Sequence, residues 1–339
     1  MTVTIKDVAK HAQVSPSTVS RVIADNPRIS PKTKEKVKEV MESLGYHPNF
    51  QARNLVIQKS QTLGIIMENS AALAFQNPFF PEVLRGISAA AHKSQFGLYL
   101  STGATEEEIF EEVVAMTLGK RVDGVILLYS KIGDRVMEYL KNSGVPFSVV
   151  GRPYAQAETI SYVDNDNVQI AKEVTDYLIG LGHRHIAFVG GTADYVVSLD
   201  RLKGYQQALT DAGLPFIQEY IAERNPMQSD EEGAIRRLME LPIRPTAIVT
   251  HDDLVAYEVI SYLEDMKLSV PEDVSVIGFN NHAISEHLKP PLSSVDISIY
   301  ELGVQAANLA LEKILDETAA VRKVTVPARL IERGSCQQL

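Results

Sequence analysis

From Gln61 onward, short apolar runs alternate with longer amphipathic segments, and this alternation limits the fold more than any other feature of the chain. One set begins with TLGIIM, PEVLRGISAAAHKSQ and GLYLST, and a second set begins with NVQIAKEVTDYLIGLG and HIAFVGG. Strands that alternate with helices predict parallel sheets joined by right-handed crossovers. A length of 339 residues suits two or three domains, so the two sets predict two similar α/β lobes.

Three segments are expected to pass between the lobes. Tyr162-Val163 is the expected first crossover, LSSVDIS returns the chain to the first lobe, and KVTVPARLIERG supplies closing strands. A helix over 299–315 is expected in the first lobe. The expected ranges are 61–161 with 292–318 for the first lobe, and 162–291 with 319–333 for the second lobe.

Before these lobes, the stretch TIKDVAKHAQVSPSTVSR reads as two short helices joined by a tight turn. Thr4 can cap the first helix, with Asp7 three residues later to complete a capping box. Ser15 can cap the second helix, and Pro16 stands at its first position, where a missing N–H costs nothing. A third helix, capped by Ser30 with Pro31 at its first position, is expected over 31–44, which gives a small three-helix head.

The second helix has one apolar side and one polar side. Val19, Val22 and Ile23 are expected to be buried. The other side carries short hydroxyls and one guanidinium, which suit close approach to phosphates and base edges, and consists of Ser17, Thr18, Ser20 and Arg21. This pattern predicts a helix-turn-helix that binds DNA; the alternative is a helical hairpin with solvated polar residues.

Charge is divided unevenly along the chain. The whole chain has a formal net charge of −10, which by itself argues against nucleic acid. Residues 1–60, however, hold ten Lys and Arg against five Asp and Glu, while the remainder holds 23 against 38. A small basic head on an acidic body favours DNA binding by the head alone.

Three motifs in order, IKDVAKHAQVSPSTVSRVI, ISPKTKEKV and LGYHPNFQARNL, resemble the LacI family of bacterial transcription repressors. The resemblance continues to the end of the chain; one departure is Gln13, where many members have glycine. It implies a DNA-binding domain over 1–46, a hinge helix or linker over 47–60, and an effector-binding and dimerisation domain over 61–339. The implied fold class is α/β, with a three-helix head, a hinge helix and a two-lobed periplasmic-binding-protein-like core.

The resemblance also implies that a homodimer binds a palindromic operator, with the second helix of each head in the major groove. Ser17 and Arg21 are expected to contact bases, with Pro16 in apolar contact. Backbone contacts are implied for Thr4, Thr18, Ser20, Ser30, Thr33 and Asn49. Leu55 matches the family's minor-groove wedge, and Arg53 is placed for the narrow groove beside it. A free linker in the absence of DNA is the alternative for this segment.

Ligands of such sheets bind outside the carboxyl ends of the strands, which are expected to meet across a cleft between the lobes. The candidate side chains at these ends are polar or aromatic: Glu68, Asn69, Phe79, Phe80, Tyr129, Asp164, Tyr195, Asp252 and Asn280. Alternating donors, acceptors and rings suit a polyhydroxylated ligand. Arg201, in DRLKGY, matches the family's arginine that reaches effector hydroxyls; its alternative role is a surface salt bridge with Asp200. Loop caps and core aromatics are the alternative for the rest.

Within the family, the body most resembles the maltose and maltodextrin operon repressors, through FQNPFFPEVLRGI, GKRVDGVILLYS, VDNDN and DRLKGYQQAL. The resemblance implies a sugar effector, maltose or a maltodextrin, that acts as an inducer. A catabolite-control regulator that binds a phosphocarrier protein, or a repressor with a purine corepressor, is the alternative within the family. A sugar-binding receptor is the alternative outside it.

Several classes of protein lack support in this sequence. Neither GxxxxGK[ST] nor GxGxxG nor GxSxG occurs, so an enzyme is not expected. Cys336 is the only cysteine, which excludes an intrachain disulfide and a thiolate metal cluster. No cofactor and no metal is expected. No apolar run reaches the roughly 18 residues of a membrane span, and no signal-peptide core is present, so the expected location is the cytoplasm, with the nucleoid when operator is bound.

Overall fold

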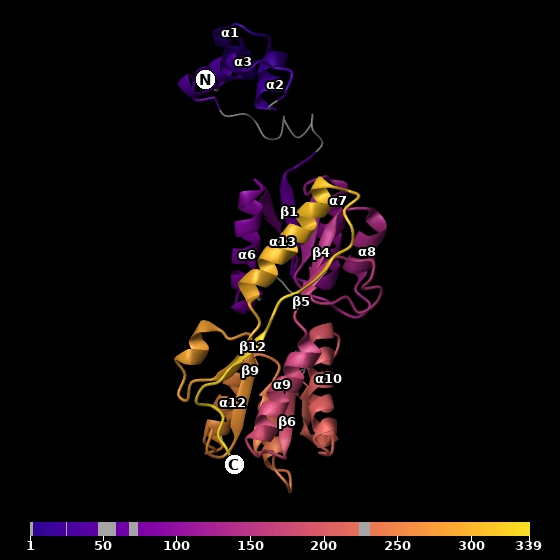
Figure 1. The fold of residues 1–339 in the computed structure, drawn as a ribbon, viewed down its shortest axis with the longest axis vertical. Helices are drawn as coiled ribbons and strands as arrows, with labels where there is room; N and C mark the ends of the chain where they lie inside the picture. Colours follow the sequence, from indigo (N-terminus) through magenta and orange to yellow (C-terminus); the bar gives the residue numbers. More distant parts are fainter. Residues whose placement is uncertain (1–2, 25, 47–58, 68–73, 224–230) are drawn as a thin grey trace. The chain divides into compact units, whose positions relative to one another are not determined.

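The computed structural model describes residues 3–24, 26–46, 59–67, 74–223 and 231–339 (Figure 1). The chain divides into two compact units, residues 1–60 and residues 61–339. We describe each unit by itself.

The head consists of three short helices, α1 (Ile5–Ala12), α2 (Pro16–Ile23) and α3 (Pro31–Ser43). Each helix begins where a hydroxyl side chain stands before its first turn, as the sequence predicts. Gln13 has a φ of 55°, so a non-glycine residue adopts the left-handed turn between α1 and α2. The small core of the head includes Val8, Val19 and Val37, each 0% exposed.

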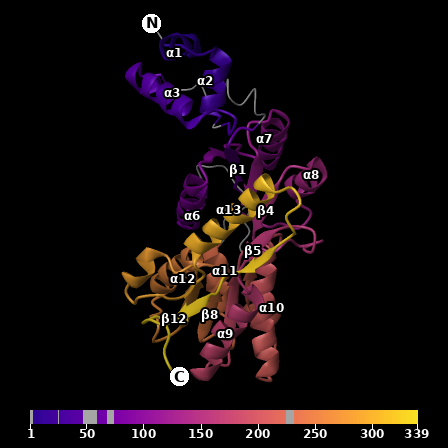
Figure 2. The same ribbon diagram turned by 45° about the horizontal axis from the view of Figure 1, so that its top comes forward.

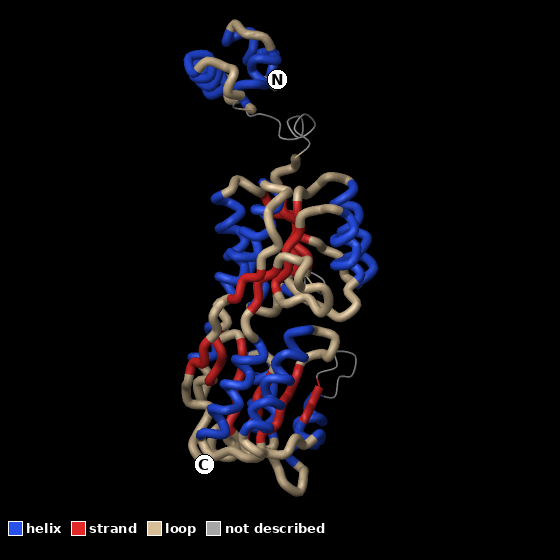
Figure 3. Tube along the Cα trace, turned by 45° about the vertical axis from the view of Figure 1, so that its right-hand side comes forward, coloured by secondary structure: helices blue, strands red, loops and turns tan. Residues whose placement is uncertain are grey.

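The second unit contains two six-stranded sheets, one in each lobe. Figure 3 shows the strands of each sheet with helices on both sides. The first sheet has the order β11-β5-β4-β3-β1-β2, and all its described pairings are parallel. Its strands are β1 (Thr62–Ile66), β2 (Gly97–Leu100), β3 (Gly124–Leu127), β4 (Phe147–Val150), β5 (Tyr162–Asp164) and β11 (Lys323–Thr325). Its helices are α6 (Phe79–Lys93), α7 (Glu106–Leu118), α8 (Arg135–Ser143) and α13 (Ile299–Leu315).

The second sheet has the order β12-β10-β9-β8-β6-β7, and β12 is antiparallel to β10. Its strands are β6 (Ile186–Gly190), β7 (Ile221–Glu223), β8 (Ala247–Thr250), β9 (Ser275–Phe279), β10 (Ser293–Asp296) and β12 (Arg329–Ile331). Its α-helices are α9 (Asn167–Gly180), α10 (Val196–Asp211), α11 (Glu231–Met239) and α12 (Asp253–Asp265), and its short 3-10 helices are η1 (Gln218–Tyr220) and η2 (Ala283–Glu286). The two sheets form the α/β core that the alternation predicts.

Three strands lie in the lobe opposite to the one expected from the sequence. β5 pairs with β4, and β11 pairs with β5, so both complete the first sheet, although residues 162 onward and 319 onward are expected in the second lobe. β10 pairs with β9 and completes the second sheet, although 292–318 is expected in the first lobe. The chain therefore changes lobe after each of these strands. The physical reason is that β5 and β10 each pair with the strand that precedes them in the chain, β4 and β9, before the chain crosses, and β11 then pairs with β5.

The helix α13 belongs to the first lobe, as the sequence predicts. It packs against α6, β3, β4 and β5, and Figures 1 and 2 both show it, in yellow, among the purple elements of that lobe. Two glycines allow the close approach of α13 to α6. A Cβ atom on Gly86 would lie 2.1 Å from the carbonyl oxygen of Tyr300, and one on Gly303 would lie 2.1 Å from that of Val83.

Candidate functional site

The exposed side of α2 is the candidate DNA-binding face of the head. Pro16, Ser17, Ser20 and Arg21 are exposed, whereas Val19 is 0% and Val22 is 3% exposed. Because positions three and four apart lie on one face of a helix, the side chains of residues 17, 20 and 21 form one surface. The surface presents two hydroxyls and a guanidinium, the groups that contact phosphates and guanine edges.

The cap residues form hydroxyl clusters at the starts of α2 and α3. Ser15 Oγ accepts from the N–H of Thr18 (3.1 Å) and is hydrogen-bonded to the hydroxyls of Ser17 (2.7 Å) and Thr18 (2.8 Å). Ser30 Oγ accepts from the N–H of Thr33 (3.2 Å) and bonds to its hydroxyl (2.8 Å). Helix N-termini carry partial positive charge and favour phosphate. Residues 18, 30 and 33 therefore stand where backbone phosphates would be favoured.

The start of α1 differs from these two. The N–H and the hydroxyl of Thr4 donate to Asp7 Oδ2 at 2.9 Å and 2.7 Å. These hydrogen bonds lower the pKa of Asp7, so a carboxylate already occupies this N-terminus.

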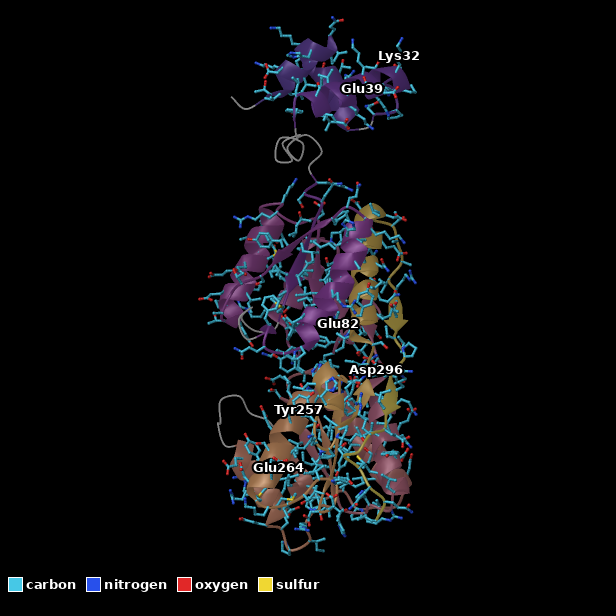
Figure 4. The ribbon with its side chains drawn as sticks, turned by 90° about the vertical axis from the view of Figure 1, so that its left-hand side faces the viewer. Lys32, Glu39, Glu82, Tyr257, Glu264 and Asp296 are labelled. Carbon is cyan, nitrogen blue, oxygen red and sulfur yellow. The ribbon has the colours of Figure 1, made fainter. Side chains whose placement is uncertain are left out.

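Figure 4 shows Lys32 and Glu39 among the side chains of α3 in the same head.

Five of the candidate residues, Asn49, Arg53, Leu55, Glu68 and Asn69, lie outside the described residues. Their roles stay predictions.

Arg201 is the centre of the candidate effector site. It lies on α10, is 3% exposed, and stacks over Phe279 with its guanidinium carbon 4.1 Å from the ring centroid. Its Nε donates to Asn167 Oδ1 (3.2 Å), and its Nη1 donates to the carbonyl oxygen of His251. Burial lowers its pKa to about 10, opposed mainly by the charge of Asp252. The arginine is therefore charged at neutral pH and held in one orientation.

Asp164, at the end of β5, joins this arrangement through Asn167. Asn167 Nδ2 donates to Asp164 Oδ1 (2.9 Å), while the backbone N–H of Arg152 donates to Asp164 Oδ2 (2.9 Å). Burial raises the pKa of Asp164 to about 6. The alternative role for Arg201, a surface salt bridge with Asp200, does not form: the guanidinium of Arg152 binds Asp200 instead (2.8 Å).

Asp252 and Asn280 stand at the ends of β8 and β9, and both are 8% exposed. Asp252 Oδ1 accepts from the N–H of Val255 (2.9 Å), so this carboxylate also caps α12. Asn280 has a φ of 93°, and its N–H donates to the carbonyl oxygen of Val295 (2.9 Å). The backbone therefore holds both side chains at the edge where Arg201 lies.

The four candidate aromatic residues do not share one environment. Phe80 is 5% exposed and packs in the hydrophobic core, with Phe79 edge-on to it at 5.4 Å. Tyr129 packs against another cluster of the first lobe, where burial raises its pKa. Tyr195 stands before the first residue of α10, with Lys131 Nζ 6.0 Å from its ring centroid. Phe80 is thus a core aromatic residue, which is the alternative to effector binding that the sequence also allows for it.

Sequence reasoning missed several buried polar residues on the second lobe. Ser198 and His282 are each 5% exposed, and within the described residues Ser198 Oγ and His282 Nε2 have no hydrogen-bond partner. A buried polar atom without a partner is costly and points to a ligand or water. Gly191 packs closely against Ser198 and His251, since a Cβ atom on it would lie 2.8 Å from Ser198 Oγ and 3.0 Å from the His251 ring. Isolated Ser and His residues form no motif, so the sequence carried no signal for them.

Two further features bear on the class of protein. In the described ranges, no helix has both the length and the apolar character that crossing a membrane requires. In the same ranges, no cluster of three or more His, Cys, Asp or Glu side chains could hold a metal ion.

Two family models match this chain. Residues 4–49 match the model for bacterial regulatory proteins of the lacI family, and residues 175–336 match a periplasmic binding protein-like domain. These matches cover the head and much of the second lobe.

Whole-chain relatives agree with these models. The HTH-type transcriptional regulator MalR of Staphylococcus xylosus is 37% identical over 98% of each chain, and catabolite control protein A of Priestia megaterium is 36% identical over 99% of each. Among solved structures, a complex of the transcriptional regulator CelR with cellobiose is 31% identical, with a TM-score of 0.77 over 98% of this chain and 99% of that one. A probable maltose operon repressor malR from Staphylococcus aureus is 26% identical, with a TM-score of 0.73 over 82% of this chain and 98% of that one.

Proposed function

This chain belongs to the LacI family of bacterial regulatory proteins, and from that premise we propose that it is a maltose- or maltodextrin-induced repressor of sugar-utilisation genes. It is a DNA-binding transcription repressor with a helix-turn-helix head and a periplasmic-binding-protein-like core. The proposal adds the identity of the effector and its action as an inducer. It also adds the assembly, a homodimer on a palindromic operator, and the location, in the cytoplasm and at the nucleoid. It assigns DNA binding to 1–46, the hinge to 47–60 and effector binding with dimerisation to 61–339.

One observation carries the effector proposal. Arg201, the residue that matches the family's effector arginine, lies oriented in a buried polar cluster with Asp164, Asn167 and Asp252. Guanidinium and carboxylate groups are well suited to adjacent sugar hydroxyls, which both donate and accept. The similarity to MalR proteins, and to a regulator solved with cellobiose, supports a saccharide as the ligand.

We expect maltose or maltotriose to bind the chain with measurable heat and to raise its melting temperature, because a ligand that binds only the folded state stabilises it. Isothermal calorimetry and a thermal-shift assay with both sugars are the test, with sucrose as the control sugar. If neither maltose nor maltotriose gave heat or a melting shift, the maltodextrin proposal would fail, whereas the assignment of the chain as a DNA-binding repressor would be unaffected.

A second candidate is a catabolite-control regulator that responds to a phosphocarrier protein or another corepressor. The similarity to catabolite control protein A, 36% identical over 99% of each chain, favours it. The thermal-shift assay separates the two when purines and the phosphocarrier protein are added to the panel. A shift with the phosphocarrier and none with the sugars would favour this second candidate.

In the head, we propose that Ser17 and Arg21 contact bases, with Pro16 in apolar contact. The proposed backbone contacts are Thr4, Thr18, Ser20, Ser30, Thr33 and Asn49, and the proposed minor-groove residues are Arg53 and Leu55. Arg21 is exposed on the same surface as Ser17, which supports its place in the groove. The hydroxyl clusters at the starts of α2 and α3 support the backbone contacts.

Arg21→Ala is expected to cost about 1–3 kcal/mol of operator binding and to relax base preference at one position of each half-site. The reason is that a bidentate contact from arginine to guanine is lost. The measurement is selection from a randomised duplex library followed by sequencing, with binding curves on the selected operator. Arg28→Ala is the matched control for the loss of one positive charge, because Arg28 is exposed and lies outside α2. Unchanged site preference in the Arg21 variant would show that α2 does not read the bases.

A further inference from the structure

The two lobes are joined by a charged contact as well as by the chain itself. Arg152 follows β4 in the first lobe, and Asp200 lies on α10 in the second. Arg152 Nη2 lies 2.8 Å from Asp200 Oδ1 and 3.0 Å from Oδ2, and Nε lies 3.3 Å from Oδ2. The side chains are 40% and 11% exposed. A fork of this kind has a fixed geometry, so it forms at one relative angle of the two lobes.

Arg152 is firmly held by its own lobe. Its N–H donates to Asp164 Oδ2 (2.9 Å), and its carbonyl oxygen accepts from Ser130 Oγ (2.7 Å). The neighbouring Gly151 N–H donates to the carbonyl oxygen of Val163 (2.8 Å). Asp200 lies within the 16-residue helix α10. Because Asp200 lies on a helix and the Arg152 backbone is hydrogen-bonded within its own lobe, a change in the lobe angle would separate the two side chains.

A backbone contact lies next to this ion pair. Residues 130–132 run antiparallel to residues 194–196: Ile132 N–H donates to the Asp194 carbonyl (2.9 Å), and Val196 N–H donates to the Ser130 carbonyl (3.1 Å). Ser130 takes part in both contacts, since its hydroxyl binds the Arg152 carbonyl. We call residues 130–132, 152, 194–196 and 200 the interlobe latch.

The covalent connections lie elsewhere along the first sheet. The chain leaves that sheet after β5 and β11, which are adjacent strands at one side of it, whereas the latch extends from the ends of β3 and β4. Asn165 ties the three connecting segments together, since its Nδ2 donates to the carbonyl oxygens of Ile297 (3.1 Å) and Val326 (2.9 Å). A rotation of the lobes about the tied segments would therefore pull the two sides of the latch apart.

We propose that the Arg152–Asp200 ion pair sets the equilibrium between latched and open lobes, and thereby the effector concentration at which this repressor responds. The second part rests on the proposed function and on the expectation that the sugar binds in the cleft between the two lobes. For a ligand that binds only the latched arrangement, the apparent dissociation constant equals the intrinsic dissociation constant divided by the latched fraction. Loss of the ion pair lowers that fraction and weakens sugar binding, although neither residue is a proposed sugar contact.

The test measures the lobe angle directly, without ligand. Spin labels are placed at Glu138→Cys on α8 and Glu264→Cys on α12, both exposed (Figure 4 labels Glu264), in a full-length Cys336→Ala background. Labelled protein is diluted into unlabelled protein, so that pulsed dipolar spectroscopy reads distances within one subunit. Arg152→Gln and Asp200→Asn are expected to increase the population at the changed distance roughly 1.4- to 5-fold. Arg135→Ala, which removes an ion pair with Glu107 inside the first lobe, is the control and leaves the distances unchanged.

The double variant Arg152→Gln with Asp200→Asn is expected to resemble each single variant, because either change removes the same pair. Unchanged distances in both single variants, or additive effects in the double variant, would overturn the latch. Calorimetry with maltose on the same proteins tests the second part, and the apparent dissociation constant is expected to rise by the factor by which the latched fraction falls. Altered distances without any maltose binding by the parent protein would retain the latch and reject the maltodextrin effector.

Discussion

Arg201→Ala is expected to give a repressor that stays on its operator at the maltose concentrations that release the parent protein. In the structure the guanidinium is fixed by Asn167, by the carbonyl of His251 and by the ring of Phe279. A sugar that accepts hydrogen bonds from its other N–H groups gains them without ordering a flexible side chain. Hydrogen bonds to charged groups are worth about 1.5–3 kcal/mol each, so losing two lowers sugar affinity by roughly 100-fold or more.

The same change leaves the operator-binding head untouched, because Arg201 lies in the other compact unit. Operator affinity without sugar is therefore expected to equal that of the parent protein. Some stability is lost, since Asn167 Oδ1 and the His251 carbonyl each lose a donor. A binding assay on operator DNA with a maltose titration measures the response, and a thermal melt confirms folding.

Arg184→Ala is the matched control for Arg201→Ala. Arg184 is in the same lobe, and its Nη1 donates to the carbonyl oxygens of Ile179 and His183, both at 2.9 Å. Its loss is expected to leave induction intact. Normal release of operator by maltose in the Arg201 variant would show that the arginine does not bind the effector.

The largest expected loss of stability comes from Gly303→Ala, at the crossing of α6 and α13. The new Cβ atom would lie 2.1 Å from the carbonyl oxygen of Val83. Backbone atoms cannot turn away as a side chain can, so the two helices must separate. Overpacking a close-packed interior costs about 1–3 kcal/mol and sometimes more, and we expect about 3 kcal/mol here. Gly86→Ala meets Tyr300 O at the same distance and is expected to cost as much.

Denaturant unfolding of the chain measures both changes, followed by circular dichroism. Gly180→Ala is the control, because Gly180 is also helical and a Cβ atom there has nothing within 4 Å. That change is expected to be neutral or to stabilise by up to about 1 kcal/mol, since alanine favours the helix. Equal stability of the Gly303 and Gly180 variants would show that α6 and α13 do not pack this closely.

Features that depend on neighbouring residues could be predicted from the sequence. The caps at Ser15 and Ser30 form the predicted bonds three residues ahead, and the apolar side of α2 is buried as its spacing predicts. The alternation of strands with helices likewise predicted two α/β lobes, each with its own sheet. Each of these signals lies within one helix or one strand–helix unit, so no distant contact was needed.

Features that depend on distant residues could not be predicted. β11 has only three residues, and only its pairing with β5, far away in the sequence, assigns it to the first sheet. The partner of Asp200 proved to be Arg152, 48 residues earlier, and not its neighbour Arg201. Phe80 looked like other strand-end aromatics, yet its side chain packs in the core. Nothing in the local sequence distinguishes these outcomes.

The late position of β11 and β12 in the chain has a consequence for how the protein is made. Each sheet takes a strand from the last part of the chain, β11 at residues 323–325 and β12 at residues 329–331. Neither lobe can complete its sheet while the ribosome still holds these residues, whereas the head, a compact unit within residues 1–60, can fold as soon as it emerges. Pairings between residues so far apart also fold slowly. A nascent chain would therefore carry a finished DNA-binding head well before it has a lobe that can receive a signal.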